Sequence, residues 1–414
     1  MTLTHFGRTG WYWIGSALIA SIISLCASPA ESAEKVIYAF QGGADGMDPG
    51  TPLIMDSSGS LYGMTALGGG STQCASGCGT VFRLTPDGAE TVLHAFDNTD
   101  GALPSSNLIF DGSGNLYGTT SNGGSFNRGT LFELASDGTE TVLYTFAGGS
   151  DGSEPSGNLI RDKNGNFYGT TPFGGSTSGS DCSSVGCGTV FKVAFDGAET
   201  VVYSFEGGTD GFQPSGGLIS DTNGNRYGTT VAGGTGNGNN CGGGDFGCGT
   251  IFRIAPDGTE TVLYSFQGGS DGFGPVGALA RDKSGNMFGT TGGGGSNGQG
   301  TVFEFSSIGT ETVLYSFKGG NDGSSPFAGV IMDKDGNLYG TTYYGGGTKC
   351  RGAGCGTVFK LAPDGSETVL VAFGHLLAGR NPEAALLKGS HGLLYGTASA
   401  GGTSNEGIVF SVKK

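Results

Sequence analysis

The sequence from Leu159 to Phe205 reads LIRDKNGNFYGTTPFGGSTSGSDCSSVGCGTVFKVAFDGAETVVYSF and contains four short segments, LIRD, NFYGTT, GTVF and ETVVYSF. Each segment is rich in β-branched or aromatic residues and is bounded by turn residues, which is the pattern of a β-strand. The connections leave no room for a helix. This stretch therefore predicts one unit of four strands.

The same four segments recur seven times in the same order. Phenylalanines that end the fourth segment mark the copies, and they lie 56, 50, 59, 61, 51 and 56 residues apart: Phe40, Phe96, Phe146, Phe205, Phe266, Phe317 and Phe373. Repetition of a small β unit at such a period is typical of propellers and solenoids. Glycine makes up 87 of the 414 residues, but it recurs in register between the strands, so the composition indicates turns and not disorder.

The connectors determine the order of the strands. A turn such as Asp162–Asn166 joins the first and second segments, and one such as Pro256–Thr259 joins the third and fourth. Both contain the glycine that a tight hairpin needs. Because strands alternate in direction, these turns share one edge of the unit, and the DGxxP crossing and the Gly-Gly loop share the other. We therefore expect LIxD innermost and ETVLYSF outermost.

The two ends of the repeat array complement each other. Lys35–Phe40 is an outer strand without a unit, and the last copy, Leu386–Val412, lacks an outer strand. Pairing them would leave no open sheet edge. We predict an all-β, seven-bladed β-propeller of four-stranded antiparallel blades, closed by a three-plus-one clasp. An open solenoid is the alternative, but it would need polar caps that the sequence does not show.

The ordered words of the repeat resemble the GloVer-type tandem-repeat family of exported bacterial proteins, with its GNLYGTT, GG, GTVFKL, PDGxET and LYSF segments. The resemblance covers about Lys35 to Val412. The chain is more distantly similar to the NHL and two-component-regulator propellers, whose DxxGNLW words correspond to Asp333–Tyr339. The resemblance implies an extracytoplasmic repeat domain and brings no established biochemical activity. The C-terminal sorting anchor of many relatives is not seen, which favours a free periplasmic or secreted protein.

The first thirty residues differ from the repeats. An apolar run, Trp11–Cys26, precedes Ala27–Ala30, whose small residues suit a signal peptidase. We expect 1–30 to be a signal peptide and 31–414 to be a single propeller domain, exported to the periplasm or secreted. Acylation of Cys26 in a lipoprotein is the alternative. Since no later apolar segment approaches the length of a membrane span, we expect no membrane insertion after signal cleavage.

The net charge of the chain argues against some classes of binding partner. With 20 Lys and Arg against 36 Asp and Glu, the formal net charge is −16. Phosphate backbones and anionic lipid surfaces repel such a chain. We expect no nucleic-acid partner, and we expect a monomer.

Eight cysteines form four close pairs in Gly-Gly loops, with the second member directly before GTVF. The pairs are Cys74 with Cys78, Cys182 with Cys187, Cys241 with Cys248, and Cys350 with Cys355. Loops with cysteines run 13, 16, 18 and 13 residues, and the three without run 8. A crosslink offsets part of the entropy lost in ordering a longer loop, and export favours disulfides. We predict four disulfides; a zinc site would need pairs from different blades to converge.

Acidic residues that recur from copy to copy are interpreted as turn residues. The aspartates of the DxxGN turn, Asp162, Asp221, Asp282 and Asp333, suit carboxylates that accept hydrogen bonds from their own backbone. Calcium binding is the alternative, but the full calcium-loop pattern is absent. We expect no metal and no cofactor.

Residues that depart from the repeat are the candidates for function. Aromatic side chains on the long-loop edge suit sugar rings, with further aromatics at the blade crossings. An unusual polar set lies at the last crossing. The candidate ligand-binding residues are Phe173, Phe246, Tyr343, Tyr344, His375, Arg380 and Glu383. The alternatives are packing of the aromatics beneath the loops and simple divergence of the closing crossing.

Residues suited to acid-base catalysis are few. His94 replaces the tyrosine of ETVLYSF, and inner-strand entrances such as Pro155–Asn158 present small, mostly neutral side chains. We assign no catalytic residue and predict a non-catalytic, extracytoplasmic binding or scaffolding module for a glycan or protein partner. The alternative is a propeller enzyme that acts on a polysaccharide or a small ester at the mouth of the channel.

Overall fold

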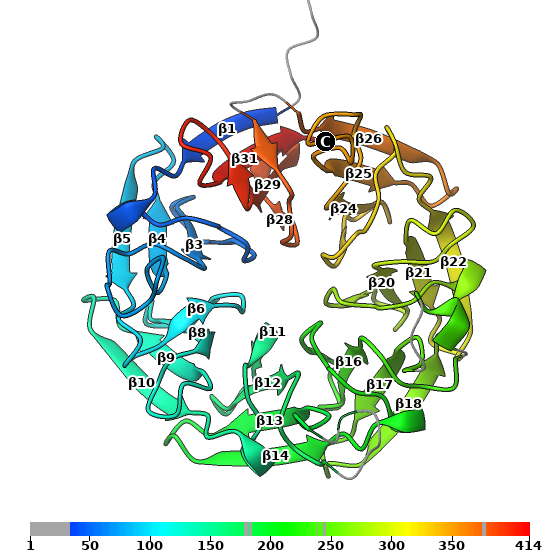
Figure 1. Ribbon diagram of the computed structural model, residues 1–414, viewed down its shortest axis with the longest axis horizontal. Coiled ribbons are helices and arrows are strands. Elements are labelled where there is room, and N and C mark those ends of the chain that lie inside the picture. The colour runs from blue at the N-terminus through cyan, green and yellow to red at the C-terminus, as the bar shows by residue number, and fades with distance from the viewer. Residues whose placement is uncertain (1–33, 178–181, 183, 237, 243–245, 375–377) are drawn as a thin grey trace, which may run out of the picture. The chain divides into compact units, whose positions relative to one another are not determined.

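Seven antiparallel blades stand around a ring in the computed structural model, and the last blade closes on the first (Figure 1). The structure describes residues 34–177, 182, 184–236, 238–242, 246–374 and 378–414. The predicted all-β, seven-bladed propeller is confirmed. Short 3-10 turns are the only helices in these ranges: η1 (Gly43–Asp45), η2 (Gly149–Asp151), η3 (Gly208–Asp210), η4 (Gly238–Asn240), η5 (Gly269–Asp271) and η6 (Ser390–Gly392).

Blades 1 to 6 each run from the innermost to the outermost strand in chain order. Blade 1 has β2 (Ile54–Met55), β3 (Leu61–Thr65), β4 (Thr80–Leu84) and β5 (Glu90–Ala95). Blade 2 has β7 (Ile109–Phe110), β8 (Leu116–Asn122), β9 (Thr130–Leu134) and β10 (Glu140–Thr145), and β6 (Ala102–Pro104) also pairs with β8. Blade 3 has β11 (Ser156–Arg161), β12 (Phe167–Thr171), β13 (Thr189–Val193) and β14 (Glu199–Ser204).

The next three blades repeat this plan. Blade 4 has β15 (Ile219–Ser220), β16 (Arg226–Thr230), β17 (Thr250–Ile254) and β18 (Glu260–Ser265). Blade 5 has β19 (Ala280–Arg281), β20 (Met287–Thr291), β21 (Thr301–Phe305) and β22 (Glu311–Ser316). Blade 6 has β23 (Ile331–Met332), β24 (Leu338–Thr342), β25 (Thr357–Leu361) and β26 (Glu367–Ala372).

Blade 7 is built from both ends of the repeat array. Its strands are β28 (Leu387–Lys388), β29 (Leu393–Ala398), β31 (Ile408–Lys413) and, outermost, β1 (Glu34–Ala39). Glu34 pairs with Val412 and Ala39 with Ile408. A short pair, β27 (Gly379–Arg380) with β30 (Ala400–Gly401), lies beside this blade. The predicted three-plus-one clasp is therefore confirmed.

The hydrophobic core lies between neighbouring blades. At every interface the phenylalanine that ends one outer strand packs edge-to-face on the GTVF or equivalent phenylalanine of the next blade, with ring centroids 4.9 to 5.2 Å apart. Phe40 and Phe82 make this contact between blades 7 and 1, and both are fully buried. Such pairs add about 0.5 to 1.5 kcal/mol to the gain from burial. The phenylalanines of the most regular repeated segments thus form the contacts that join the blades.

The glycine of LYGTT makes room for the second ring of each pair. A Cβ on Gly289 would lie 2.5 Å from Cζ of Phe303, which packs on Phe266. We predict that Gly289→Ala lowers the free energy of unfolding by about 1 to 3 kcal/mol through overpacking. In denaturant unfolding, Phe303→Leu in the same chain should recover part of that loss. Strictly additive losses would show that the two side chains do not compete for space.

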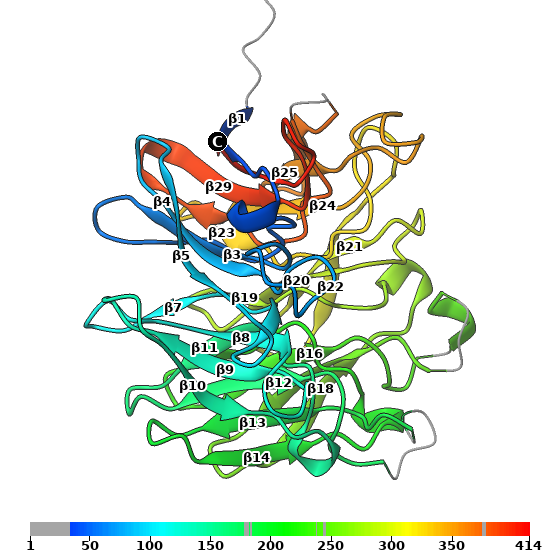
Figure 2. The same cartoon turned by 60° about the vertical axis from the view of Figure 1, so that its left-hand side comes forward.

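Two sets of connectors lie on opposite sides of the ring (Figure 2). Hairpin turns form one side, and the blade crossings and Gly-Gly loops form the long-loop face, as predicted. Each DxxGN turn is held by its aspartate. Asp333 accepts hydrogen bonds from the N–H groups of Asp335 and Asn337, and the Tyr339 hydroxyl donates to it at 2.9 Å. Burial raises the pKa of Asp333, but these bonds and one from the Asn337 side chain outweigh it and hold the pKa at about 2. The carboxylate therefore acts as the hydrogen-bond acceptor of the turn.

The four predicted disulfides are confirmed, with Cα atoms 5.3, 5.1, 5.1 and 5.4 Å apart. They support the joints between blades. The carbonyl of the second cysteine accepts the N–H of the residue before proline in the next crossing, as Cys355 does from Asn381 at 2.8 Å. Asn381 has a left-handed backbone, with φ of 57°, and the six equivalent residues do the same. Because residues before proline favour extended backbone, this joint needs support. The copies without cysteine make the same hydrogen bond from Asp48, Glu154 and Ser325, so the disulfide braces the loop that carries the acceptor.

Among the residues that the structure describes, no helix combines the length and the apolar character that a membrane span requires.

Candidate functional site

Two tyrosines directly follow β24 on the long-loop face of blade 6. The N–H of Tyr343 donates to the Ser325 carbonyl at 3.0 Å, and Tyr344 exchanges backbone hydrogen bonds with Ser324. This ladder extends the blade and holds both residues. The Tyr343 ring lies 4.6 Å from the Tyr344 ring and 5.6 Å from the Phe327 ring, measured between centroids. The three rings therefore form one continuous aromatic group.

This aromatic group remains open to solvent. Phe327 is 40% exposed and Tyr344 is 39% exposed. Phe327 follows Pro326 at the entrance of blade 6 and lies over blade 5, where a Cβ on Gly292 would come within 2.9 Å of its ring. At the position of Tyr343, blade 5 has only this glycine. The absence of a side chain on one blade and the aromatic side chains on the next produce an exposed, largely apolar surface.

An acidic residue from the next blade completes the group. Glu383 follows Pro382, at the position in blade 7 that Phe327 has in blade 6. Its side chain keeps contact with solvent, but the surrounding protein removes enough water to raise its pKa. A hydrogen bond from Ser399 opposes this shift, and the charge of Asp48 adds to it. Oε2 of Glu383 lies 3.8 Å from where Gly50 of blade 1 would carry a Cβ.

Asp48 approaches the same place from blade 1. It is the residue before proline in the crossing from blade 7, and its N–H donates to the Glu406 carbonyl at 3.0 Å. Burial raises the pKa of Asp48. Burial also raises the pKa of Tyr343, and the charge of Glu383, with smaller effects from Tyr344 and Asp48, adds to this. These electrostatic couplings show that side chains from blades 6, 7 and 1 share one environment.

We call Phe327, Tyr343, Tyr344, Asp48 and Glu383 the aromatic–acidic cluster. Its rings offer flat apolar faces, and its two carboxylates accept hydrogen bonds from a ligand. Sugars match this combination, because their C–H faces stack on aromatic rings while their hydroxyl groups donate to carboxylates. Neither acid needs to be fully ionised to accept such bonds.

The other predicted aromatics lie elsewhere on the long-loop face. Phe173 of blade 3 lines an open pocket of about 540 Å³ with Arg128 and Glu154, whose charged atoms are 3.9 Å apart. Phe246 of blade 4 is 52% exposed, and its ring lies 6.1 Å from that of the buried Phe212. The four predicted aromatics therefore belong to three separate places.

The predicted polar set is only partly described. His375 lies outside the described residues. Arg380 lies in β27, where it pairs with Ala400, and among the described residues no ion pair joins it to Glu383. The charge of Glu383 instead acts on Tyr343, whose pKa it raises. The structure thus brings Tyr343, Tyr344 and Glu383 together.

Asp48 is not a candidate from the sequence, and Phe327 is one of the crossing aromatics (Phe212, Phe273 and Phe327) outside the list of candidate ligand-binding residues. The signal was available in the position after the crossing proline. In chain order, that position reads Gly50, Ser105, Ser156, Ser215, Val276, Phe327 and Glu383. One large aromatic and one carboxylate stand out, and they are adjacent in the ring. Asp48 needed the closed ring, because it is hundreds of residues from its neighbours in sequence.

Comparison with known proteins identifies the repeat and the fold. The family model described as the Gloeobacter/Verrucomicrobia repeat matches residues 25–241 and 237–414. A search of curated proteins found no match.

Among solved structures, a streptogramin B lyase is similar at 13% identity and a TM-score of 0.56, covering 93% of this chain and 99% of the other. A putative 6-phosphogluconolactonase from Bacteroides uniformis is 17% identical, with a TM-score of 0.52 and coverage of 84% and 91%. Puromycin hydrolase is 14% identical with a TM-score of 0.55, and the match covers 90% of this chain and 52% of that protein. At these identities the likeness shows the fold alone.

Proposed function

Because the chain belongs to the Gloeobacter/Verrucomicrobia repeat family and folds as a seven-bladed propeller, we propose that it is an exported carbohydrate-binding module. The ligand lies on the aromatic–acidic cluster. The observation that carries this proposal is the exposed surface of three adjoining aromatic rings with two carboxylates beside it. The rest of the ring serves as a rigid support.

Export is supported by the disulfides. Four crosslinks within the loops suit an oxidising compartment outside the cytoplasm. The apolar segment Trp11–Cys26 would direct the chain there and be removed. The periplasm and the cell exterior both contain polysaccharides, so a sugar ligand is available in either location.

A sugar explains the cluster better than a protein partner. One of the three rings comes from the entrance of blade 6 and two come from the residues after β24. Together they cover an area suited to a few sugar units. A stable protein interface buries roughly 800 Å² on each partner and needs a larger apolar centre. The carboxylates at the edge of the rings also match hydroxyl donors.

We predict that Tyr343→Ala and Tyr344→Ala each weaken glycan binding by about three- to tenfold, from the loss of one stacking ring. The measurement is binding to an array of bacterial and plant polysaccharides, followed by calorimetry with the best ligand. Phe246→Ala is the matched control, because it removes an exposed ring from another blade. Equal affinity of all three variants and the parent would refute the cluster as the binding site.

An enzyme is the second candidate, because Asp48 and Glu383 form a carboxylate pair in which burial raises both pKa values. A raised carboxyl pKa suits a general acid in glycoside cleavage. Incubation of the purified protein with the bound polysaccharide separates the two functions. Release of reducing ends that stops in Glu383→Gln would identify an enzyme; binding without release supports the module.

A further inference from the structure

A repeated polar contact lies at the outer rim between successive blades. In five copies, the tyrosine of ETVLYSF donates its hydroxyl to the aspartate of the following Asp-Gly, at 2.6 to 2.9 Å. The glutamate that begins the outer strand of the next blade lies beside this pair, as Glu199 lies beside Tyr144 and Asp151. The tyrosine serves as a neutral hydrogen-bond donor in these contacts.

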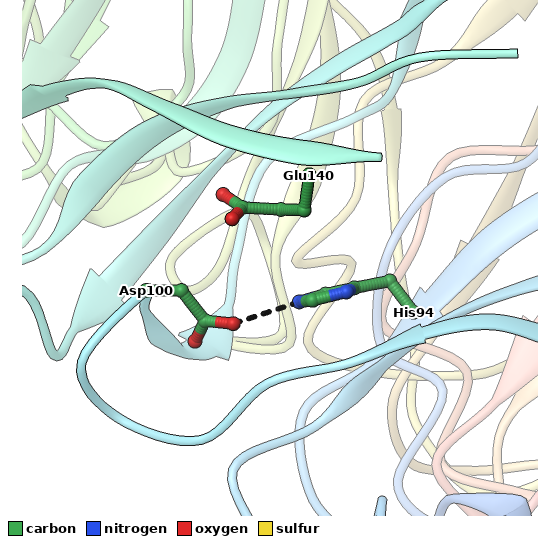
Figure 3. Close-up of side chains that lie close together, drawn as sticks. All are labelled: His94, Asp100 and Glu140. Carbon is green, nitrogen blue, oxygen red and sulfur yellow. Dashed lines mark hydrogen bonds and ion pairs between the residues drawn. The ribbon is translucent and has the colours of Figure 1, made fainter. Parts of the chain in front are cut away.

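The contact between blades 1 and 2 has a different composition. His94 takes the place of the tyrosine, and its Nε2 lies 2.9 Å from Oδ2 of Asp100 (Figure 3). The two residues are six positions apart, whereas tyrosine and aspartate are seven apart in the other copies. The shorter crossing matches the shorter side chain. The imidazole keeps the ring contact of the tyrosine, 4.8 Å edge-to-face from Phe96.

Glu140 at the start of β10 supplies a third ligand atom. Figure 3 shows its carboxylate reaching the His94–Asp100 contact from blade 2. One nitrogen or oxygen of each residue lies within 4.8 Å of the other two. Oε1 of Glu140 is buried and has no hydrogen-bond partner. The side chains of His94 and Asp100 are only 17% and 18% exposed, so all three groups are largely shielded from water.

We propose that His94, Asp100 and Glu140 bind one zinc-type divalent metal ion between blades 1 and 2. Imidazole and carboxylate are the donors that zinc takes from proteins together with thiolate. Bonds of about 2.0 to 2.2 Å at a tetrahedral angle place donor atoms roughly 3.3 to 3.6 Å apart. The His94 and Asp100 atoms are already near that spacing, and a rotation of the Glu140 side chain brings in the third. A fourth position is left for water or a ligand.

Local charge supports a cation at this place. Asp97 and Asp100 bring further negative charge close to Glu140, and His94 lies among them. A divalent ion would offset the repulsion among the acids and give the buried Oε1 a partner. The equivalent glutamates in the tyrosine-bearing copies also have a buried oxygen without a partner, so the histidine is what distinguishes this site: Glu90, Glu199, Glu260, Glu311 and Glu367. A tyrosine hydroxyl, with its high pKa, does not replace an imidazole nitrogen.

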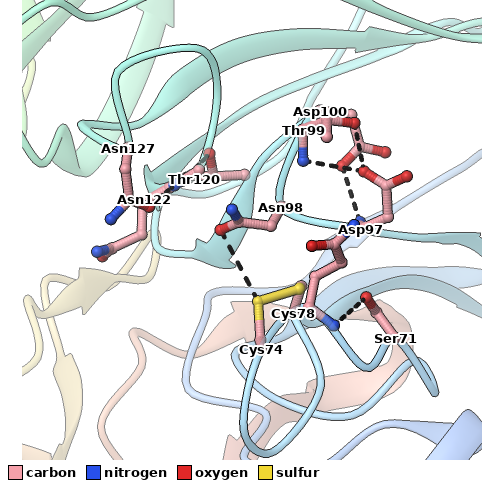
Figure 4. Close-up of a disulfide and its surroundings, with 12 residues drawn as sticks. Ser71, Cys74, Cys78, Asp97, Asn98, Thr99, Asp100, Thr120, Asn122 and Asn127 are labelled. Carbon is pink, nitrogen blue, oxygen red and sulfur yellow. Dashed lines mark hydrogen bonds between the residues drawn. A yellow bond between two sulfur atoms is a disulfide. The ribbon is translucent and has the colours of Figure 1, made fainter.

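The site is close to the first disulfide. Figure 4 shows the Cys74–Cys78 bridge beside the crossing from Asp97 to Asp100, with Asn98 Oδ1 3.9 Å from Cys74 Sγ. The braced loop restricts movement of the crossing that carries Asp100. His94 lies on β5 and Glu140 on β10, so the strand pairing of the ring holds these two ligands, and the disulfide lies beside the crossing that carries Asp100.

The test is metal titration of the full exported chain without a polyhistidine tag, after removal of metals with chelator. We expect one equivalent of Zn²⁺ by calorimetry and a visible absorption spectrum with Co²⁺. His94→Tyr restores the residue of the other copies, so it should fold normally and lose the Co²⁺ spectrum, with at least tenfold weaker Zn²⁺ binding. Glu140→Gln should also weaken binding.

Matched controls make the outcome decisive. Glu199→Gln changes the equivalent glutamate beside a tyrosine, and His391→Ala removes an exposed histidine; both should bind Zn²⁺ like the parent. No Zn²⁺ bound by the parent, or equal binding by His94→Tyr, would overturn the proposal. Binding of Ca²⁺ that His94→Tyr leaves unchanged would likewise overturn it, because carboxylates alone would then be the ligands.

Discussion

A chain that lacks Glu34–Phe40 is expected to lose the native ring. These residues form the outer strand of blade 7, so their removal leaves β31 with an open edge. Phe40 is fully buried against Phe82 and its cluster also includes Leu53, Leu61 and Val409. Losing the strand pairing and this buried ring costs about 5 kcal/mol or more, which approaches the whole stability of many domains.

A rearranged chain provides the control for this deletion. Glu34 pairs with Val412 near the end of β31, so residues 34–40 can follow Lys414 through a short Gly-containing hairpin. Blade 7 would then have four consecutive strands, like the other blades. We expect the truncated protein to aggregate or melt far below the parent, and the rearranged protein to recover the parental Tm. A truncated protein with an unchanged Tm would show that the clasp contributes little.

The second large effect is a loss of stability as pH rises from about 5 to 8.5. Burial, with a smaller contribution from a neighbouring aspartate, raises the pKa of Glu90, Glu199, Glu260 and Glu367 to about 7 and that of Glu311 to about 8. Because the folded pKa exceeds the unfolded value, the folded state binds these protons more tightly. Their contribution is fully present below about pH 4.5 and is lost as pH rises through 7 to 8.

A variant with glutamine at these five positions tests the pH effect. Glutamine has similar volume and no charge, so between pH 5 and 8.5 the Tm of the quintuple variant should fall much less than that of the parent, with Glu140 as the remaining rim glutamate of raised pKa. After a discount for solvent screening, we expect about 0.5 to 1 kcal/mol per site at high pH. Calorimetry across the pH range is the measurement, with the exposed Glu206→Gln as control. Parallel pH curves for parent and quintuple variant would contradict the role of the rim glutamates.

The rim glutamates are an example of contacts that the repeated sequence does not reveal. In the sequence, the glutamate belongs to the repeated segment ETVLYSF, and nothing about the residue itself indicates a special environment. In the ring, it meets an aspartate that belongs to the preceding blade, as Glu311 meets Asp271. The same contact, changed by one substitution, becomes the proposed metal site at His94. The substitution is visible in the sequence, but the residues that contact it are not.

The aromatic–acidic cluster shows the same limit. Tyr343 and Tyr344 are visible in the sequence as aromatic residues on the long-loop edge, and Glu383 is visible because its crossing departs from the repeat. Their proximity could not be predicted, nor could the separation of Phe173 and Phe246 from them. Phe327 was seen at a crossing but was not assigned to the site. The sequence shows which single residues depart from the repeat, but it does not show which of them lie close together in space.

The fold itself followed from the sequence alone. The number of blades, the order of strands, the clasp and the disulfides depend on local patterns and on chain order, because hairpins and loop crosslinks join residues close in sequence. The contents of the candidate sites depend on contacts between blades, where about 35 or more residues separate the partners. Packing of the phenylalanine pairs sets the alignment of neighbouring blades, and only the closed ring decides which side chains then meet.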